Sequence, residues 1–145
     1  MNRKKLDAAN MPAFTVKWVW AWLIMKGVKD IENRRYGPVV PKGTCAVTFS
    51  KANSRALYDA CLEALYEDEV VLVPPYEELK QYAGKVVGVV DYEVLGATNS
   101  HWWDRESTPI LLKRPKWLRN PFPVTGALGI WKMKPADAHR LIAEL

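Results

Sequence analysis

Residues 85–95 read KVVGVVDYEVL, which is the longest β-rich run in the chain. Its first half, from Val86 to Val90, is continuously apolar apart from one glycine. A strand with one solvated face would alternate apolar and polar residues, whereas a strand covered on both faces carries apolar residues at successive positions. The run therefore predicts a central strand that is buried on both sides of a sheet.

Shorter patterns precede this run. Residues 14–17 alternate as a strand does, and the apolar residues that follow recur at three- and four-residue spacings, as on a helix. Gly27 closes that helix, because glycine readily adopts the left-handed conformation that ends many helices. On this side we expect a strand at 14–17, a helix at 18–25, an extended segment at 29–36, a strand at 43–49 and an amphipathic helix at 56–65 with acidic outer faces.

The region after the central run is less regular in pattern. Residues 96–103 read as a loop, 109–112 as a short strand, 114–123 as a basic, proline-containing irregular stretch and 126–133 as a closing strand. Pro135 is expected to begin a terminal helix, since proline is favoured at the first helical position. Strands and helices mix without a regular βαβ alternation, so we predict an α+β fold.

Length and composition are those of one globular domain. The chain has 145 residues, of which 49% are hydrophobic and 26% charged, and this composition lies far from that of disordered chains. Residues 1–12 are polar and end in Met-Pro, so we expect a flexible lead-in there and a single domain over 13–145.

The net charge of +5 is spread unevenly, at +6 over residues 1–50, −5 over 51–100 and +4 over 101–145. Two basic ends are compatible with a polyanion meeting a surface that both ends build. Many ordinary proteins share this asymmetry, so the charge distribution alone does not decide between a nucleic-acid binder and another globular protein.

Several classes of protein fit the sequence poorly. Cys45 and Cys61 are the only cysteines and read as reduced thiols of a cytoplasmic protein. The apolar run 14–25 is interrupted by Lys17, is followed by no small-residue cleavage site, and is too short to span a bilayer. We therefore expect no membrane partner. No metal-ligand cluster or cofactor motif is present, so no metal and no cofactor are expected.

The most specific motif is GVKDIENR at residues 27–34, directly after the tryptophan-rich helix. It resembles the G-x-K-x-x-E-x-R motif of the ASCH (activating signal cointegrator homology) family. Other segments resemble the family in the expected order, so that the resemblance runs from about Thr15 to Met133. These segments are residues 20–24, the strand end at 47–51, the strand 87–91, the Ser-x-Trp loop at 100–102 and the Pro-rich ending at 121–131.

The resemblance implies a PUA-like fold, a small mixed or antiparallel β-barrel flanked by α-helices. It also implies a basic cleft, lined by the lysine, glutamate and arginine of the motif, that holds single-stranded RNA or a modified nucleoside. Family members are associated with RNA binding, transcriptional coactivation and RNA processing. DNA is a further possible partner, and the sequence leaves the oligomeric state open.

The chemistry of the motif residues agrees with such a cleft. Lys29 and Arg34 could neutralise a phosphate, or the guanidinium could bond a base edge, while Glu32 could accept from an exocyclic amine. Trp102 or Trp103 could stack on an unpaired base. The residues that we expect in the binding site are Lys29, Glu32, Asn33, Arg34, Ser50, Lys51, Ser100, Trp102 and Trp103. A second basic patch with an aromatic residue among its members comprises Lys113, Arg114, Lys116 and Arg119.

Structural roles compete with these functional ones. The motif charges could form only a local ion-pair network that braces the barrel, and strict strand alternation would put Lys29 on the opposite face from Glu32 and Arg34 unless the chain turns near Asp30. The tryptophans of the 18–25 helix are expected to be packing residues. An extended chain would bury one of the adjacent tryptophans 102 and 103 and expose the other. The second basic patch could be a solvated loop.

Two further functions remain open. The chain could be a hydrolase acting on RNA or on a modified nucleoside, with Lys29, Glu32 and Lys51 as its catalytic residues. One ASCH subgroup hydrolyses N(4)-acetylcytidine with a threonine three residues after the motif lysine, and Glu32 occupies that position here. The chain could instead be a protein-interaction adaptor that uses its acidic helix.

Overall fold

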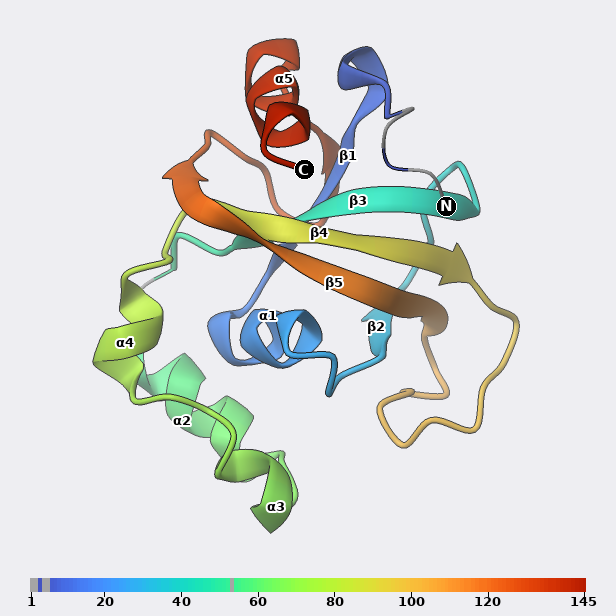
Figure 1. The fold of residues 1–145 in the computed structure, drawn as a ribbon. Coiled ribbons are helices and arrows are strands. Elements are labelled where there is room, and N and C mark those ends of the chain that lie inside the picture. The colour runs from blue at the N-terminus through green and yellow to red at the C-terminus, as the bar shows by residue number, and fades with distance from the viewer. Residues whose placement is uncertain (1–2, 4–5, 53) are drawn as a thin grey trace.

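The computed structural model describes residue 3 and residues 6–52 and 54–145. These residues form a mixed α+β fold with one six-stranded sheet (Figure 1). The elements are η2 (Ala8–Asn10), β1 (Pro12–Val16), α1 (Trp18–Met25), β2 (Ile31–Arg34), β3 (Lys42–Phe49), α2 (Arg55–Glu63), α3 (Glu67–Val70), α4 (Tyr76–Lys80), β4 (Lys85–Val94), β5 (Thr108–Pro123), β6 (Ile130–Lys132) and α5 (Pro135–Ala143).

The sheet has the order β2-β5-β4-β3-β1-β6. Strands β1 and β3 pair in parallel, and the other neighbours pair antiparallel. The sheet curls into a half-barrel with β2 and β6 at its edges, so the expected small barrel is seen in an open form. Helix α5 and η2 cover one face, and α1 to α4 lie on the other (Figure 1).

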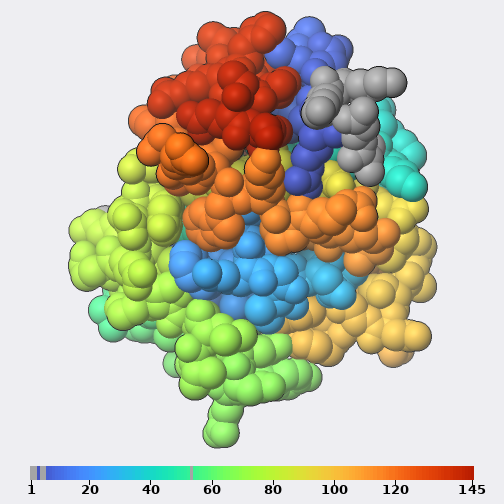
Figure 2. Space-filling model, in the orientation of Figure 1, coloured from blue at the N-terminus to red at the C-terminus, as the bar shows by residue number. Residues whose placement is uncertain are grey.

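Strand β4 lies inside the sheet and is buried on both faces, as its apolar run predicts. Val87 and Val90 join the core on the α1 side, which also contains Phe14. Val86 and Val89 join a second core cluster on the α5 side. In Figure 2, β5 (orange) runs along the front between α5 above and α1 below, and the segment α2–α4 (green) packs beside α1.

Strand β5 differs most from the sequence-based expectation. The stretch 114–123, predicted to be irregular, continues the strand that begins at Thr108. Its register with β4 shifts between Val89 and Asp91 and again between Val86 and Gly88. Bulges of this kind carry extra residues outside the ladder, where the missing N–H of a proline costs no hydrogen bond. Pro115 and Pro121 fall in these shifted segments and Pro123 is the last residue of the strand, so the prolines of this stretch do not interrupt it.

The segment ahead of β1 packs more closely than a loose lead-in would. Strand β1 begins at Pro12, and both Ala8 and Met11 are buried against the α5 side of the sheet. Apolar contacts thus hold residues 6–12 to the domain. Part of the expected lead-in, at residues 1–2 and 4–5, lies outside the described residues.

Smaller differences concern element ends. The closing strand expected at 126–133 is only Ile130–Lys132, and the extended segment at 29–36 becomes a strand only over Ile31–Arg34. The amphipathic helix ends at Glu63, after which the chain forms the separate short helix α3. Both cysteines are free and buried, in agreement with the expected reduced thiols. In the part of the chain that is described, no helix has the length and apolar character needed to cross a bilayer.

Asp91 is a buried carboxylate in β4, and three side chains from distant segments meet it. Its Oδ2 accepts from Arg114 Nε at 2.7 Å, and its Oδ1 accepts from Thr44 Oγ1 at 2.8 Å and from Arg3 Nε at 3.3 Å. Burial by itself raises the pKa of Asp91, but the hydrogen bonds from Arg114 and Thr44 and the charge of Arg3 outweigh it and leave the pKa below its ordinary value.

Asp91 should therefore make stability depend on acidity. A carboxyl whose pKa is lowered by folding contributes stability that is present above its ordinary pKa of 3.8 and is lost as the pH falls through the lower folded value. We expect the difference in free energy of unfolding between the wild type and Asp91→Asn to shrink as the pH falls below about 4. Urea denaturation at several pH values measures it, and a difference independent of pH would contradict the prediction.

Candidate functional site

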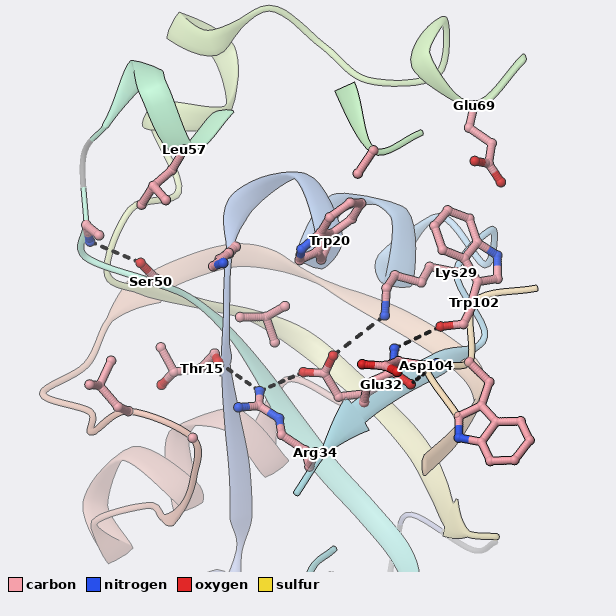
Figure 3. Close-up of a pocket in the computed structure, with 18 of the residues that line it drawn as sticks. Thr15, Trp20, Lys29, Glu32, Arg34, Ser50, Leu57, Glu69, Trp102 and Asp104 are labelled. Carbon is pink, nitrogen blue, oxygen red and sulfur yellow. Dashed lines mark hydrogen bonds and ion pairs between the residues drawn. The ribbon is translucent and has the colours of Figure 1, made fainter. Parts of the chain in front are cut away.

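A cleft of about 750 Å³ opens at the end of the sheet where β1, β2 and α1 meet the loop after β4 and the segment α2–α3 (Figure 3). The residues that line it come from all of these segments. They are Thr15, Val16, Lys17, Trp20, Lys29, Glu32, Asn33, Arg34, Ser50, Ala52, Leu57, Ala64, Tyr66, Glu69, His101, Trp102, Trp103, Asp104, Leu128 and Gly129.

The three charged residues of the 27–34 motif form a continuous network on one side of the cleft. Glu32 lies between the two cations, with Oε2 2.6 Å from Arg34 Nη2 and Oε1 3.6 Å from Lys29 Nζ. Figure 3 shows the three side chains in a row, and Leu57 and Glu69 lie on the opposite side in this view. The side chains of Lys29 and Glu32 are only 6% and 9% exposed. The network is therefore part of the protein interior as well as of the cleft wall.

A turn before β2 brings Lys29 to the same side as Glu32. The backbone N–H of Lys29 donates to Leu23 O at 3.1 Å, which continues the end of α1 past Gly27. Ser100 Oγ donates to the carboxylate of Asp30 at 2.6 Å and fixes the next residue. Because β2 begins only at Ile31, strand alternation does not apply to Lys29. The three motif charges consequently share the cleft.

Burial sets the electrostatics of this network. Desolvation lowers the pKa of Lys29, and the neighbouring carboxylate of Glu32 opposes this shift without cancelling it. Lys29 Nζ also donates to the backbone carbonyl of Ile31. Arg34 Nη2 donates to Thr15 O at 3.0 Å, while Arg34 Nε is buried with no hydrogen-bond partner among the described residues. The guanidinium thus keeps donor capacity beyond its pair with Glu32.

Aromatic side chains stand above the network. The rings of Trp20 and Trp102 meet edge to face with centroids 6.4 Å apart, and Lys29 Nζ lies 5.9 Å from the Trp102 ring. Trp103 also lines the cleft, and its indole Nε1 donates to Ser107 O at 3.1 Å. Both adjacent tryptophans are half-buried, because the chain turns at residues 101–102 instead of running extended. Trp20, expected only as a packing residue, faces the cleft.

Asn33 and Ser100 hold the tryptophan loop in place. The Asn33 amide donates to Trp102 O at 2.8 Å and accepts from Asp104 N at 2.9 Å. Ser100 is absent from the cleft lining, but its Oγ accepts from Trp102 N at 3.2 Å. Asn33 lines the cleft with its amide engaged, and both residues are positioned to orient Trp102.

Part of the rim was missed by sequence reasoning. His101 Nε2 lies 3.0 Å from Glu69 Oε2, and the His101 ring lies between those of Tyr66 and Trp102, with centroids at 4.9 and 4.5 Å. This contact joins the loop after β4 to α3. The acidic residues of this region read as a solvated face, and only the position of His101 beside Trp102 hinted at its place on the rim.

Lys51 and the second basic patch lie outside the cleft. Ser50 lines the cleft as expected, but the exposed Lys51 packs against Gly84 and lines a separate hollow. The patch belongs to β5, where Arg114 pairs with Asp91 and Lys116 Nζ donates to Leu145 O at 2.7 Å. The patch residues are exposed, as in the solvated loop considered from sequence, but they belong to strand β5.

The cleft is balanced in charge and not basic. Lys17, Lys29 and Arg34 line it as cations, and the three carboxylates Glu32, Glu69 and Asp104 line it as anions. Over the described residues, no three side chains of the His, Cys, Asp and Glu types come together as a metal site. No protein-family model matches the chain, and no curated protein has a significantly similar sequence.

Proposed function

We propose that the chain is an RNA-binding module of the ASCH kind with a PUA-like fold, and that its cleft holds one unpaired or modified nucleobase. The proposal rests on the sequence resemblance at residues 27–34 and 100–102. The mixed half-barrel with helices on both faces is compatible with it. In support, every segment that resembles the family except 87–91 contributes residues to one cleft.

One observation carries the proposal: a buried, charged hydrogen-bonding network lies beside half-buried aromatic rings in the same cleft. An unpaired base offers a polar edge and a flat π-face, and single-stranded RNA is recognised through both. Glu32 could accept from an amino group, and the remaining donors of Arg34 could serve a ring nitrogen or carbonyl. The rings of Trp20 or Trp102 could stack on the base.

The balance of charge in the cleft favours recognition of a base over recognition of phosphate. Three cations face three carboxylates, so the cleft offers a polyanion little net attraction. A single-stranded RNA, a single-stranded DNA or a modified nucleoside could each supply the base. Binding in the cleft itself should accordingly depend only weakly on salt.

Hydrolysis of RNA or of a modified nucleoside is the second candidate, and the electrostatics of Lys29 favour it. Because its pKa is lowered by burial, Lys29 loses its proton at a lower pH than an exposed lysine does, which suits a residue that exchanges protons with a substrate. Glu32 is within reach of the same proton. Lys51 lies outside the cleft, so Lys29 and Glu32 would be the catalytic pair.

Trp102→Ala is the variant that tests base binding. Stacking of one base on an aromatic ring contributes about 1–3 kcal/mol, so we expect this variant to bind a short labelled single-stranded RNA roughly 5- to 150-fold more weakly than the wild type. Trp102→Phe should recover part of the loss, because it restores a ring. Fluorescence anisotropy measures the affinities, and thermal unfolding verifies that each variant is folded.

Tyr36→Ala is a matched control, since it removes an exposed ring that does not line the cleft. It should bind RNA as the wild type does. Equal affinities of the wild type and Trp102→Ala would contradict the cleft proposal, and no binding by the wild type would favour a protein-interaction adaptor. After incubation with the protein, the RNA is run on a gel and N(4)-acetylcytidine is analysed by chromatography. A binding module leaves both molecules intact, whereas a hydrolase cleaves at least one of them.

A further inference from the structure

A second hollow, of about 520 Å³, lies beside the cleft. Lys51 and Lys134 line it with the hydroxyl-bearing Thr125, and Asp137 is the one carboxylate among its described lining residues. The stem of Lys51 lies over Gly84, where a Cβ would come within 3.0 Å of Lys51 Cγ. A glycine at this position therefore leaves room for the lysine to lie along the surface toward the hollow.

The two hollows share their borders. Ser50 and Ala52 line the cleft, and Lys51 between them lines the second hollow. On the other side, Leu128 and Gly129 line the cleft, and Thr125 of the same connection between β5 and β6 lines the second hollow. A ligand chain that leaves the cleft between these two segments would therefore come close to Lys51.

The opposite end of the cleft has the opposite charge. Helix α3 begins with Glu67, Asp68 and Glu69, and Glu69 lines the cleft rim. A phosphodiester chain would be repelled there and attracted toward the other end, where Lys17 lines the cleft and Lys51 and Lys134 line the neighbouring hollow. The cleft therefore distinguishes its two ends electrostatically, although its own lining is balanced.

We propose that the hollow between Lys51 and Lys134 is a backbone subsite, which holds phosphates of the RNA strand whose base occupies the cleft. This inference rests on the proposed function. Lysine ammonium groups bind phosphate as point charges, and Thr125 could donate to a phosphate oxygen. The RNA strand then runs from the cleft across Ser50 and Lys51 and away from α3.

The double variant Lys51→Gln, Lys134→Gln tests the subsite. Each phosphate contact on a single strand adds about 0.7 to the slope of log affinity against log salt concentration, so the slope for a short labelled single-stranded RNA should fall by about 1.4. Affinity at low salt should fall about tenfold. The control Lys26→Gln, Lys80→Gln removes the same net charge at exposed positions that line neither hollow, and it should leave both quantities close to the wild-type values.

The outcomes separate the two proposals. Equal slopes for the wild type and the Lys51, Lys134 variant, or an equal loss in the Lys26, Lys80 control, overturn the subsite. If Trp102→Ala still weakens binding in that case, the cleft proposal stands alone. If the wild type does not bind the RNA, or binds it without dependence on Trp102, the cleft proposal fails and the subsite fails with it.

Discussion

Replacing Glu32 with alanine is expected to lower the free energy of unfolding by about 3–5 kcal/mol. Glu32 is the shared counter-ion of Lys29 and Arg34, and its side chain is 9% exposed. Its removal leaves one nearly buried ammonium and one partly buried guanidinium without a carboxylate partner. An uncompensated charge inside a protein is far more costly than a broken pair in water, because solvent cannot replace the lost partner.

Asp59→Ala provides the matched control for this prediction. Asp59 pairs with Arg55 at 3.3 Å, but its side chain is 55% exposed, so removing this carboxylate should cost less than about 1 kcal/mol. Urea denaturation of both variants measures the contrast. A Glu32→Ala variant no less stable than Asp59→Ala would show that solvent or a rearranged side chain replaces the carboxylate.

The same experiment bears on the choice between bracing and binding. If the ion-pair network only braces the fold, Glu32→Ala should lose stability and nothing more is required. If the cleft binds RNA, Trp102→Ala should lose RNA affinity, although Trp102 lies outside the network. The two roles are compatible, because hydrogen-bonding groups that the fold already holds in place need little ordering when a ligand arrives. A large effect in both variants would mean that the cleft contains a network that braces the fold and an aromatic ring that binds RNA.

Patterns with a single physical cause were predictable from sequence. The apolar run of β4 identified the buried central strand, because a valine-rich run of this length without alternation is typical of a strand covered on both faces. The spacing of apolar residues over 18–25, followed by Gly27, predicted a helix that ends just before the motif charges. The choice of Lys29, Glu32 and Arg34 followed from the resemblance, and the three share the cleft because the chain turns at residues 26–27 and becomes a strand only at Ile31.

Features that depend on tertiary partners were not predictable. The prolines of β5 argue against a strand until the bulges opposite β4 are known. Glu69 is buried and pairs with His101, which lies about thirty positions away in the chain. Lys51 directly follows the cleft residue Ser50 in sequence, yet its side chain lies over Gly84, outside the cleft. In each case the deciding neighbour is distant in sequence.

Gly88→Ala should be the most damaging of the small substitutions, with a loss of about 3 kcal/mol or more in the free energy of unfolding. A Cβ at this position would collide with the backbone oxygen of Lys116 and lie 2.5 Å from Met25 Cε. Gly88 pairs with Trp117 in β5, and Trp117 Nε1 donates to Met25 O at 3.1 Å. Strand β4, strand β5 and the end of α1 therefore meet at Gly88, where the absence of a side chain leaves room for the contact.

Gly96→Ala is the control, because no atom lies within 4 Å of a Cβ built there, and its free energy of unfolding should change by less than about 0.5 kcal/mol. If Gly88→Ala folds, relief of the collision requires α1 or β5 to move outward. Helix α1 carries Trp20 and leads directly to Lys29, so the variant should also bind RNA more weakly than Gly96→Ala. Unaltered stability and affinity in Gly88→Ala would mean that α1 is not held against the sheet at this point.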